Sequence, residues 1–252
     1  MKKVILFSAI IIGTLNILNS QNSEPLYVYN FYKVNEGHEE SYENVVKTFV
    51  SGIQKKLIEE GCKDMWIFRK VDPTTEMSNY ISHYTIDIYN EGREPCDINW
   101  RKEAFPSLPE NLIDELMTIH QNNRKRIYVA RLGLVANYNK EAKPAEFSIV
   151  NFMRVNNITK YSKKHIESTK GIFEKYTPRQ LWSANNRLDI ESYATDEWNY
   201  MTVDGYYSRE DAMKSSNIPE KVRIQSNKKY GLNNEMRTNK KRMLSSLIMY
   251  LN

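Results

Sequence analysis

The 252-residue sequence predicts an α+β fold made of two similar units that follow each other in one chain. The segment "VYNFYKVNE" of the first half returns as "IVNFMRVNN" in the second half, and the segments that follow recur in the same order. Large apolar side chains occupy both faces of the first of these strands, so its sheet should pack against a second sheet and not face water. We therefore expect the two units to meet sheet to sheet.

The first 20 residues have the layout of a secretory signal peptide. Lys2 and Lys3 precede an apolar run over residues 4–18, and Ser20 is a small residue before a polar stretch. An N-terminal membrane anchor is the alternative, but the run is shorter than the about 20 apolar residues that span a bilayer. We expect cleavage after Ser20, a secreted protein of the periplasm or the extracellular space, and no membrane span in the mature chain.

The first unit, expected over residues 24–139, contains one strong helix between strands. After the strand "VYNFYKVNE", apolar side chains recur at helical spacing over residues 38–61, and Gly61 stands where a helix needs a left-handed residue to end. The segments "DMWIFRKV" and "HYTIDIY" are rich in aromatic and branched residues and predict two strands. A mixed, partly helical segment and the strand-like "NRKRIYVARLGLV" complete the unit.

The second unit, expected over residues 145–252, repeats these segments after a polar linker around Pro144. The apolar face of its predicted helix covers residues 159–176 and is weaker than that of the first unit. The strand pair "QLWSANNRL" and "YMTVDGY" aligns with the first pair, and "NKKRMLSSLIMYL" aligns with the terminal segment. The expected equivalent positions are Asn30 and Asn151, Trp66 and Trp182, Thr85 and Thr202, Asp87 and Asp204, Tyr89 and Tyr206, Asn123 and Asn239, Arg126 and Arg242, and Leu134 and Tyr250.

The order β-α-β-β-α-β in each unit is that of ferredoxin-like domains. Over nearly the whole mature chain, this tandem order resembles the dimeric α/β-barrel superfamily, in which two ferredoxin-like units pack sheet to sheet. The resemblance implies an intramolecular α/β barrel. The superfamily includes haem-degrading and quinol-type monooxygenases, tandem haem enzymes such as chlorite dismutases, and proteins of no known activity.

Two cysteines predict a disulfide in an exported protein. Cys62 precedes the second predicted strand and Cys96 follows the third. Because these two strands form an antiparallel hairpin, the entry of one and the exit of the other lie at the same end of the sheet. We expect a Cys62–Cys96 bridge, and the alternative is two unrelated buried thiols.

Polar side chains alternate on the third strand of each unit and are candidates for a pocket. The six residues are His83, Thr85, Asp87, Tyr200, Thr202 and Asp204. The alternative is that they form a solvated or interfacial strand face. No further carboxylate or histidine completes a ligand set around Asp87 or Asp204, so no metal site is expected.

The resemblance to haem-degrading members of the superfamily implies a second candidate site. In those proteins an Asn on the first strand, a Trp after the third strand and a His on the second helix form the haem pocket, and this chain has Asn30, Trp100 and His120 in that order. The second unit keeps Asn151 without such a Trp or His. The alternative is that His120 and also His165 are structural residues that pack beside apolar helix faces.

The net charge of the chain and its sequence motifs exclude several classes of function. The formal net charge of +5 includes the two signal lysines, and the basic clusters at 124–126 and 240–242 are typical of solvated faces, so nucleic acid is not an expected partner. The sequence contains no Gly-rich phosphate loop, nucleophile elbow or Ser/His/Asp signature. We expect a monomer or weak homo-oligomer that binds a small apolar or aromatic ligand, or a partner, without catalysis or cofactor. The alternative is a haem-degrading or cofactor-free monooxygenase.

Overall fold

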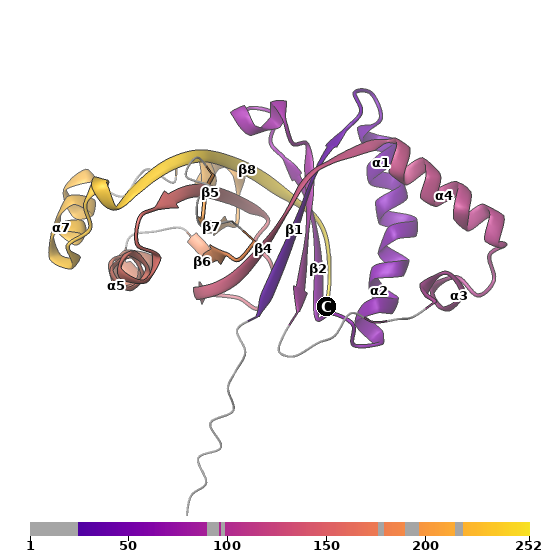
Figure 1. Ribbon diagram of the computed structural model, residues 1–252. Helices are drawn as coiled ribbons and strands as arrows, with labels where there is room; N and C mark the ends of the chain where they lie inside the picture. Colours follow the sequence, from indigo (N-terminus) through magenta and orange to yellow (C-terminus); the bar gives the residue numbers. More distant parts are fainter. Residues whose placement is uncertain (1–24, 90–95, 97–98, 176–178, 190–196, 215–218) are drawn as a thin grey trace, which may run out of the picture.

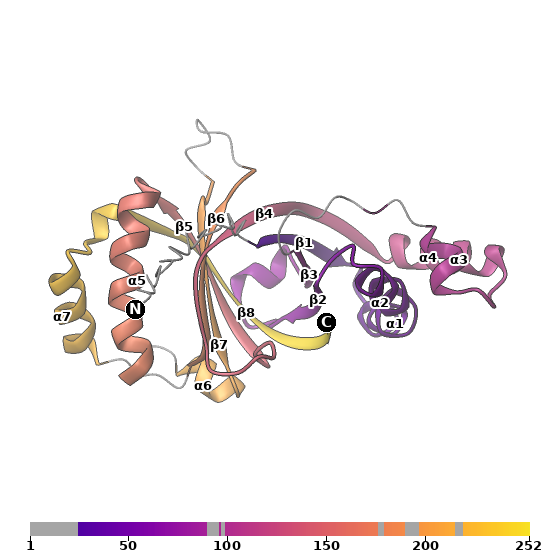
Figure 2. The same cartoon turned by 90° about the horizontal axis from the view of Figure 1, so that it is seen from below.

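Eight antiparallel strands close into one barrel, and helices cover it on two opposite sides (Figures 1 and 2). The computed structural model describes residues 25–89, 96, 99–175, 179–189, 197–214 and 219–252, so the predicted signal peptide lies outside the described residues. The elements of the first unit are β1 (Leu26–Val34), α1 (Glu39–Val45), a π-helical turn (Val46–Val50), α2 (Ser51–Glu59), β2 (Met65–Val71), a 3₁₀ turn (Glu76–Asn79), β3 (His83–Tyr89), α3 (Trp100–Ala104), α4 (Glu110–Asn122) and β4 (Arg124–Asn139).

The second unit repeats this order of strands and helices. Its elements are β5 (Phe147–Val155), α5 (Ile158–Lys175), β6 (Arg179–Arg187), β7 (Tyr200–Tyr206), α6 (Arg209–Met213), α7 (Glu220–Tyr230), a 3₁₀ turn (Asn234–Met236) and β8 (Arg237–Leu251). Helices α1, α2 and α4 lie outside the first sheet, and α5 and α7 lie outside the second (Figure 2). The prediction of two ferredoxin-like units in an intramolecular α/β barrel is confirmed.

Two long strands close the barrel. The strand order is β1-β3-β2-β8-β5-β7-β6-β4, so each unit contributes four neighbouring strands and the units join along β2–β8 and β4–β6. The beginning of β4 pairs with β1 of its own unit, and its end pairs with β6 of the other unit. Strand β8 divides its pairing between β5 and β2 in the same way. This closure leaves no sheet edge open among the eight strands.

The register of the long strands corrects three predicted equivalences. Val34 pairs with Arg124, and the equivalent Val155 pairs with Arg237. Arg124 therefore matches Arg237, and the predicted matches of Asn123 with Asn239, Arg126 with Arg242 and Leu134 with Tyr250 are all wrong by three residues. Both terminal segments are basic with little alternation, so their register is set by pairing with β1 and β5 and not by their own pattern.

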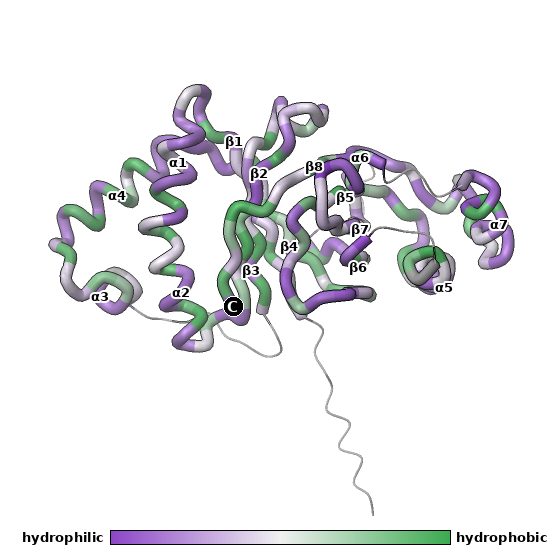
Figure 3. The backbone as a smooth tube through the Cα atoms, turned by 180° about the vertical axis from the view of Figure 1, so that it is seen from behind, coloured by the Kyte–Doolittle hydropathy of each residue, from purple (hydrophilic) through white to green (hydrophobic). Residues whose placement is uncertain are grey.

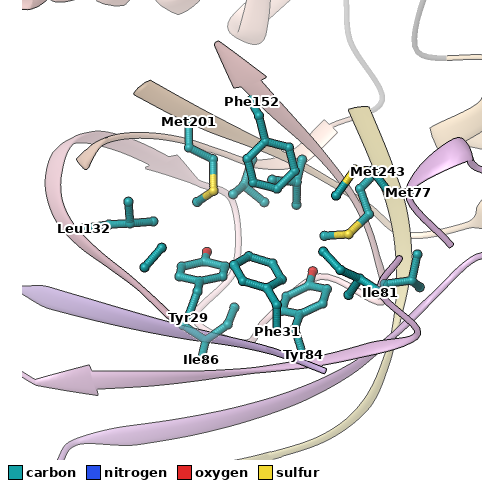
Figure 4. Packing of buried hydrophobic residues seen from close by; sticks show 14 of the residues in the cluster. Tyr29, Phe31, Met77, Ile81, Tyr84, Ile86, Leu132, Phe152, Met201 and Met243 are labelled. Carbon is teal, nitrogen blue, oxygen red and sulfur yellow. The ribbon is translucent and has the colours of Figure 1, made fainter. Parts of the chain in front are cut away.

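Aromatic side chains from both units fill the barrel. Along β1 the residues Tyr29 and Phe31 point inward, seven strands contribute buried residues to this interior cluster, and Leu181 of β6 packs against it. Figure 4 shows Phe152 and Met201 opposite Phe31 and Tyr84, and the rings of Phe31 and Phe152 lie 6.2 Å apart between their centroids. In Figure 3 apolar stretches follow the strands around β2 and β3, whereas polar and apolar positions alternate along the helices. The predicted sheet-to-sheet contact is this interior.

One charged side chain lies inside this apolar barrel. Arg69 on β2 is only 3% exposed. Its guanidinium donates hydrogen bonds to the carbonyl oxygens of Ala145 (2.9 Å) and Glu146 (3.1 Å) and to the Ser245 hydroxyl (3.1 Å). Tyr84 also bonds the Ser245 hydroxyl at 2.7 Å. Arg69 thus joins β2 of the first unit to β8 and to the linker before β5.

The end of α2 positions the disulfide. Gly61 adopts a φ of 71°, and the backbone N–H groups of Gly61 and Cys62 donate to Ile58 (2.9 Å) and Leu57 (2.8 Å), as in a Schellman motif. Cys62 and Cys96 are joined, with 5.3 Å between their Cα atoms. The bridge ties the corner between α2 and β2 to the segment after β3. Among the described residues, no helix is long and apolar enough to cross a membrane.

Candidate functional site

In each unit, a cavity lies between the outer face of the sheet and the helices. The second-unit pocket has a volume of about 300 Å³ and lies between β5–β8 and helices α5 and α7. The first-unit pocket has a volume of about 250 Å³ and lies under α1, α2, α3 and α4. The two pockets occupy equivalent places in the two units. Side chains two residues apart along a strand point to the same face of the sheet, so equivalent strand residues of both units face the helices.

The floors of both pockets share one polar cluster. In the first unit, the amide of Asn30 donates to Asp87 at 3.1 Å, and Lys63 forms a buried ion pair with the same carboxylate. In the second unit, Asn151 donates to Asp204 at 3.0 Å, and Arg179 lies 3.1 Å from this carboxylate.

The cationic members of these clusters were not predicted, although the sequence contains a signal for them. Lys63 and Arg179 each precede the matched tryptophans, Trp66 and Trp182, by the same interval. Extending that alignment toward the N-terminus would have paired the two residues.

A hydrogen-bonded pair of a tyrosine and an arginine also occurs in both units. The guanidinium of Arg237 donates to the hydroxyl of Tyr161 at 2.6 Å, and Arg124 donates to the hydroxyl of Tyr42 at 3.4 Å. The tyrosines come from the first helix of each unit and the arginines from the first residue of β8 and β4. Arg124 also stacks on the ring of Tyr32, with 3.8 Å from its guanidinium carbon to the ring centroid. Sequence reasoning missed this pair because it aligned the terminal strands in the wrong register.

Helix α5 builds the outer wall of the second-unit pocket. Its first turn is capped by Asn157, whose side chain accepts a hydrogen bond from the Lys160 backbone at 2.9 Å. Tyr161, His165 and Ile172 follow at helical spacing and line the cavity. Apolar walls therefore come from this helix and from Trp182 and Met153 on the sheet.

Arginines dominate the charge of this pocket. Its lining includes four arginines, Arg179, Arg223, Arg237 and Arg242, against one aspartate, Asp204. Arg223 and Arg242 are exposed at the rim, whereas Arg179 lies deep beside Asp204. A guanidinium donates two parallel hydrogen bonds to a carboxylate or phosphate, so this set of residues favours an anionic ligand.

His165 is a neutral side chain within this charged lining. Burial, together with the nearby guanidinium groups of Arg237 and Arg179, lowers the pKa of His165 to about 3. Its ring packs 4.9 Å from the Tyr161 ring and 5.4 Å from the Trp182 ring. The buried Nδ1 atom has no hydrogen-bond partner among the described residues. His165 is thus a packed residue, as predicted, whose ring also lines the cavity.

The third-strand residues divide between the pockets and the core. Thr85 and Asp87 line the first-unit pocket, and Thr202 and Asp204 line the second. His83 is instead enclosed, with its Nε2 atom 3.3 Å from the Glu43 carboxylate. This contact and a hydrogen bond from Lys70 lower the pKa of Glu43 to about 2. The equivalent Tyr200 packs edge-on against Tyr161 at 5.3 Å.

Asn30, Trp100 and His120 all line the first-unit pocket. The His120 ring is 5% exposed and stacks parallel to the Tyr42 ring at 5.3 Å. Burial, with a smaller effect of Arg124, lowers the pKa of His120 to about 3, and its Nδ1 atom has no partner among the described residues. The structure therefore brings the three side chains into one cavity.

This cavity does not fit a haem. Its volume of about 250 Å³ is below the about 300–1,000 Å³ typical of pockets for drug-sized ligands, and a porphyrin is larger than most of these ligands. The Asn30 amide is already bonded to Asp87, and Tyr42 covers one face of the His120 ring. Within the described part of the chain, no group of three His, Cys, Asp or Glu side chains is placed to hold a metal ion.

Comparison with known proteins finds similarity in structure alone. No model of a known protein family and no curated protein matches the chain. A "putative monooxygenase" from Lactobacillus acidophilus NCFM is 11% identical with a TM-score of 0.52, and the match covers 91% of this chain and 100% of that one. A second "putative monooxygenase", from Fusobacterium nucleatum subsp. nucleatum, is 14% identical with a TM-score of 0.52, over 91% and 95% of the two chains.

A mutant chlorite dismutase from Candidatus Nitrospira defluvii in complex with cyanide is 7% identical with a TM-score of 0.50, and the match covers 91% of this chain and 92% of that one. At such low identities, these similarities concern the fold and not the chemistry.

Proposed function

Since the chain has the fold of the dimeric α/β-barrel superfamily, we propose that it is an exported protein whose second-unit pocket binds a small organic anion with an apolar or aromatic body, without catalysis. The observation that carries this proposal is the cavity of about 300 Å³ lined by four arginines and one aspartate. The rings of Tyr161 and Trp182 supply a surface for the apolar body of the ligand, and the guanidinium groups supply donors for its acidic group.

The protonation states of the pocket support binding over catalysis. A general acid or base works best with a pKa near the working pH. The pKa of His165 is about 3, and burial raises the pKa of Tyr161 above its ordinary value, so neither side chain exchanges a proton readily near neutral pH. The Asp204 carboxylate already accepts a hydrogen bond from Asn151 and forms an ion pair with Arg179. These groups are suited to holding a ligand in a fixed electrostatic environment.

The binding proposal predicts that benzoate binds saturably and that benzyl alcohol, its neutral analogue, binds at least tenfold more weakly. Arg237→Gln and, separately, the rim variant Arg223→Gln should each weaken benzoate binding by about tenfold, because each removes one charge-assisted contact of about 1.5 kcal/mol. Isothermal titration measures these constants. Because His165 stays neutral above its pKa of about 3, the affinity should be constant between about pH 5 and pH 8.

Arg126→Gln is the matched control, since Arg126 is exposed and lies on β4, outside the second-unit pocket. Equal affinity of wild type and both pocket variants for benzoate, or equal affinity of wild type for benzoate and benzyl alcohol, would contradict the proposal. Thermal unfolding of each variant separates a lost contact from a lost fold.

The monooxygenase alternative rests on the convergence of Asn30, Trp100 and His120 in the first-unit pocket. A haem protein would give a saturable Soret shift on titration with haem, and His120→Ala would abolish this shift. Our proposal predicts weak, unsaturable changes that are the same in wild type and His120→Ala. The two functions are therefore separated by a single absorbance titration.

Export rests on the charged start and the apolar run of residues 4–18. The disulfide between Cys62 and Cys96 is consistent with an oxidising compartment. N-terminal sequencing of the mature protein should begin at Gln21. Recovery of soluble protein that retains Met1 would contradict export.

A further inference from the structure

A third cavity, which we name the mouth pocket, lies at the junction of the two units and apart from both unit pockets. It has a volume of about 490 Å³, within the range typical of small-molecule sites. Met77, Tyr80 and Ile81 reach it from the segment between β2 and β3, and Phe152, Trp198 and Lys241 reach it from the second unit. Because both units line it, this pocket exists only in the closed barrel.

The walls of the mouth pocket are apolar and aromatic. Met77, Ile81 and Phe152 are buried and belong to the barrel interior, where Figure 4 shows them. The Trp198 ring meets the Phe152 ring edge-on, with 5.0 Å between centroids. At the rim, Tyr80 is 57% exposed and Ile127 is 39% exposed. Exposed apolar side chains beside an apolar cavity indicate a site for a flat apolar ligand.

Some of the charged groups around the mouth pocket form ion pairs and others do not. Arg187 stacks on the Trp198 ring at 4.7 Å and is paired with Glu197 (2.5 Å) and Asp189 (2.9 Å), so these three groups together carry one net negative charge. The Lys241 ammonium lies 5.0 Å from the centroid of the Tyr80 ring. In the part of the chain that the structure describes, neither Lys240 nor Lys241 forms an ion pair, so these two lysines outweigh that negative charge and leave the rim with a net charge of +1.

We propose that the mouth pocket is a second ligand site, which binds a flat apolar ring system carrying one carboxylate. The ring system lies against Trp198 and Tyr80, and the carboxylate meets the ammonium group of Lys241. This site differs from the second-unit pocket in its residues and in its chemistry. Lysines at the rim of an aromatic cavity recognise a single charge on a large apolar body, whereas a set of arginines recognises a compact anion.

The test uses naphthalene carboxylate and its neutral analogue, naphthylmethanol, in isothermal titrations of the purified protein. We expect wild type to bind naphthalene carboxylate saturably. Tyr80→Ala should weaken this binding about tenfold through the lost ring contact, and Lys241→Gln should weaken it about fivefold through the lost charge. Both side chains are exposed, so both variants keep the fold. Lys55→Gln, on the far side of the first unit, is the matched control and should bind like wild type.

Under the proposed function the second-unit pocket also accepts aromatic carboxylates, so naphthalene carboxylate is titrated with the variant Arg237→Gln as well, in which binding to that pocket is weakened. The affinity of the mouth pocket for this ligand should be the same in Arg237→Gln as in wild type. Absence of saturable binding to wild type would overturn the inference. Weakening by Arg237→Gln but not by Lys241→Gln would do the same, because the ligand would then occupy the second-unit pocket. Equal affinity for naphthylmethanol would also overturn it, since the assigned role of Lys241 requires the carboxylate.

Discussion

The double variant Cys62→Ser/Cys96→Ser should unfold with a free energy about 3–4 kcal/mol lower than that of wild type. The bridge closes a loop between residues separated by 34 positions, and closing a loop of this length removes that much conformational entropy from the unfolded chain. The folded state should keep its geometry without the bridge, because β2 and β3 are paired from Met65 and Ile88 to Lys70 and His83. Equilibrium unfolding in urea, monitored by circular dichroism, measures the difference.

Wild type treated with a reductant provides the control, and its unfolding midpoint should coincide with that of the double variant. Alkylation of unreduced, denatured wild type should modify no thiol. A double variant within about 1 kcal/mol of wild type would mean that the bridge contributes little to the constraint on the unfolded chain. A wild type with two alkylated thiols would show that the bridge does not form in the isolated protein.

Arg69→Met should lower the free energy of unfolding by about 2–3 kcal/mol. Arg69 is enclosed in the barrel and donates hydrogen bonds to two carbonyl oxygens at 2.9 and 3.1 Å and to the Ser245 hydroxyl. Methionine preserves much of the length of the side chain but leaves the Ala145 carbonyl oxygen without this donor, and an orphaned buried acceptor costs about 1–3 kcal/mol. The removal of a buried charge offsets part of the loss, because burial already lowers the pKa of Arg69.

The neighbouring residue supplies a matched control. Lys70 follows Arg69 on β2 but points outward, and its exposed ammonium pairs with Glu43 at 2.7 Å. Lys70→Met should change stability by less than about 1 kcal/mol, as expected for a partly solvated ion pair. Arg69→Lys should fall between wild type and Arg69→Met, because it retains the charge without the planar fork of donors. Equal stability of Arg69→Met and Lys70→Met would contradict the assigned role of Arg69.

The residues of the pocket floors could be predicted from the sequence because they recur. Asn30 and Asn151, and Asp87 and Asp204, occupy matching positions on strands whose alternation places them on one face. The same alignment places Lys63 opposite Arg179, but a cation before a strand is common on solvated surfaces and does not by itself indicate a site. The alignment could not match Arg124 with Arg237, because the register of β4 and β8 depends on their hydrogen bonds to β1 and β5.

The sequence by itself determined the order of the elements, the duplication and the inward and outward faces of the strands, because these follow from local periodicity and from comparison of one half with the other. Only the tertiary structure decided how the barrel closes, through β2–β8 and β4–β6. Such pairing joins backbone groups of distant segments, and every strand offers the same backbone groups whatever its side chains. The enclosure of Arg69, the volumes of the unit pockets and the existence of the mouth pocket all follow from that closure, so no local pattern contained them.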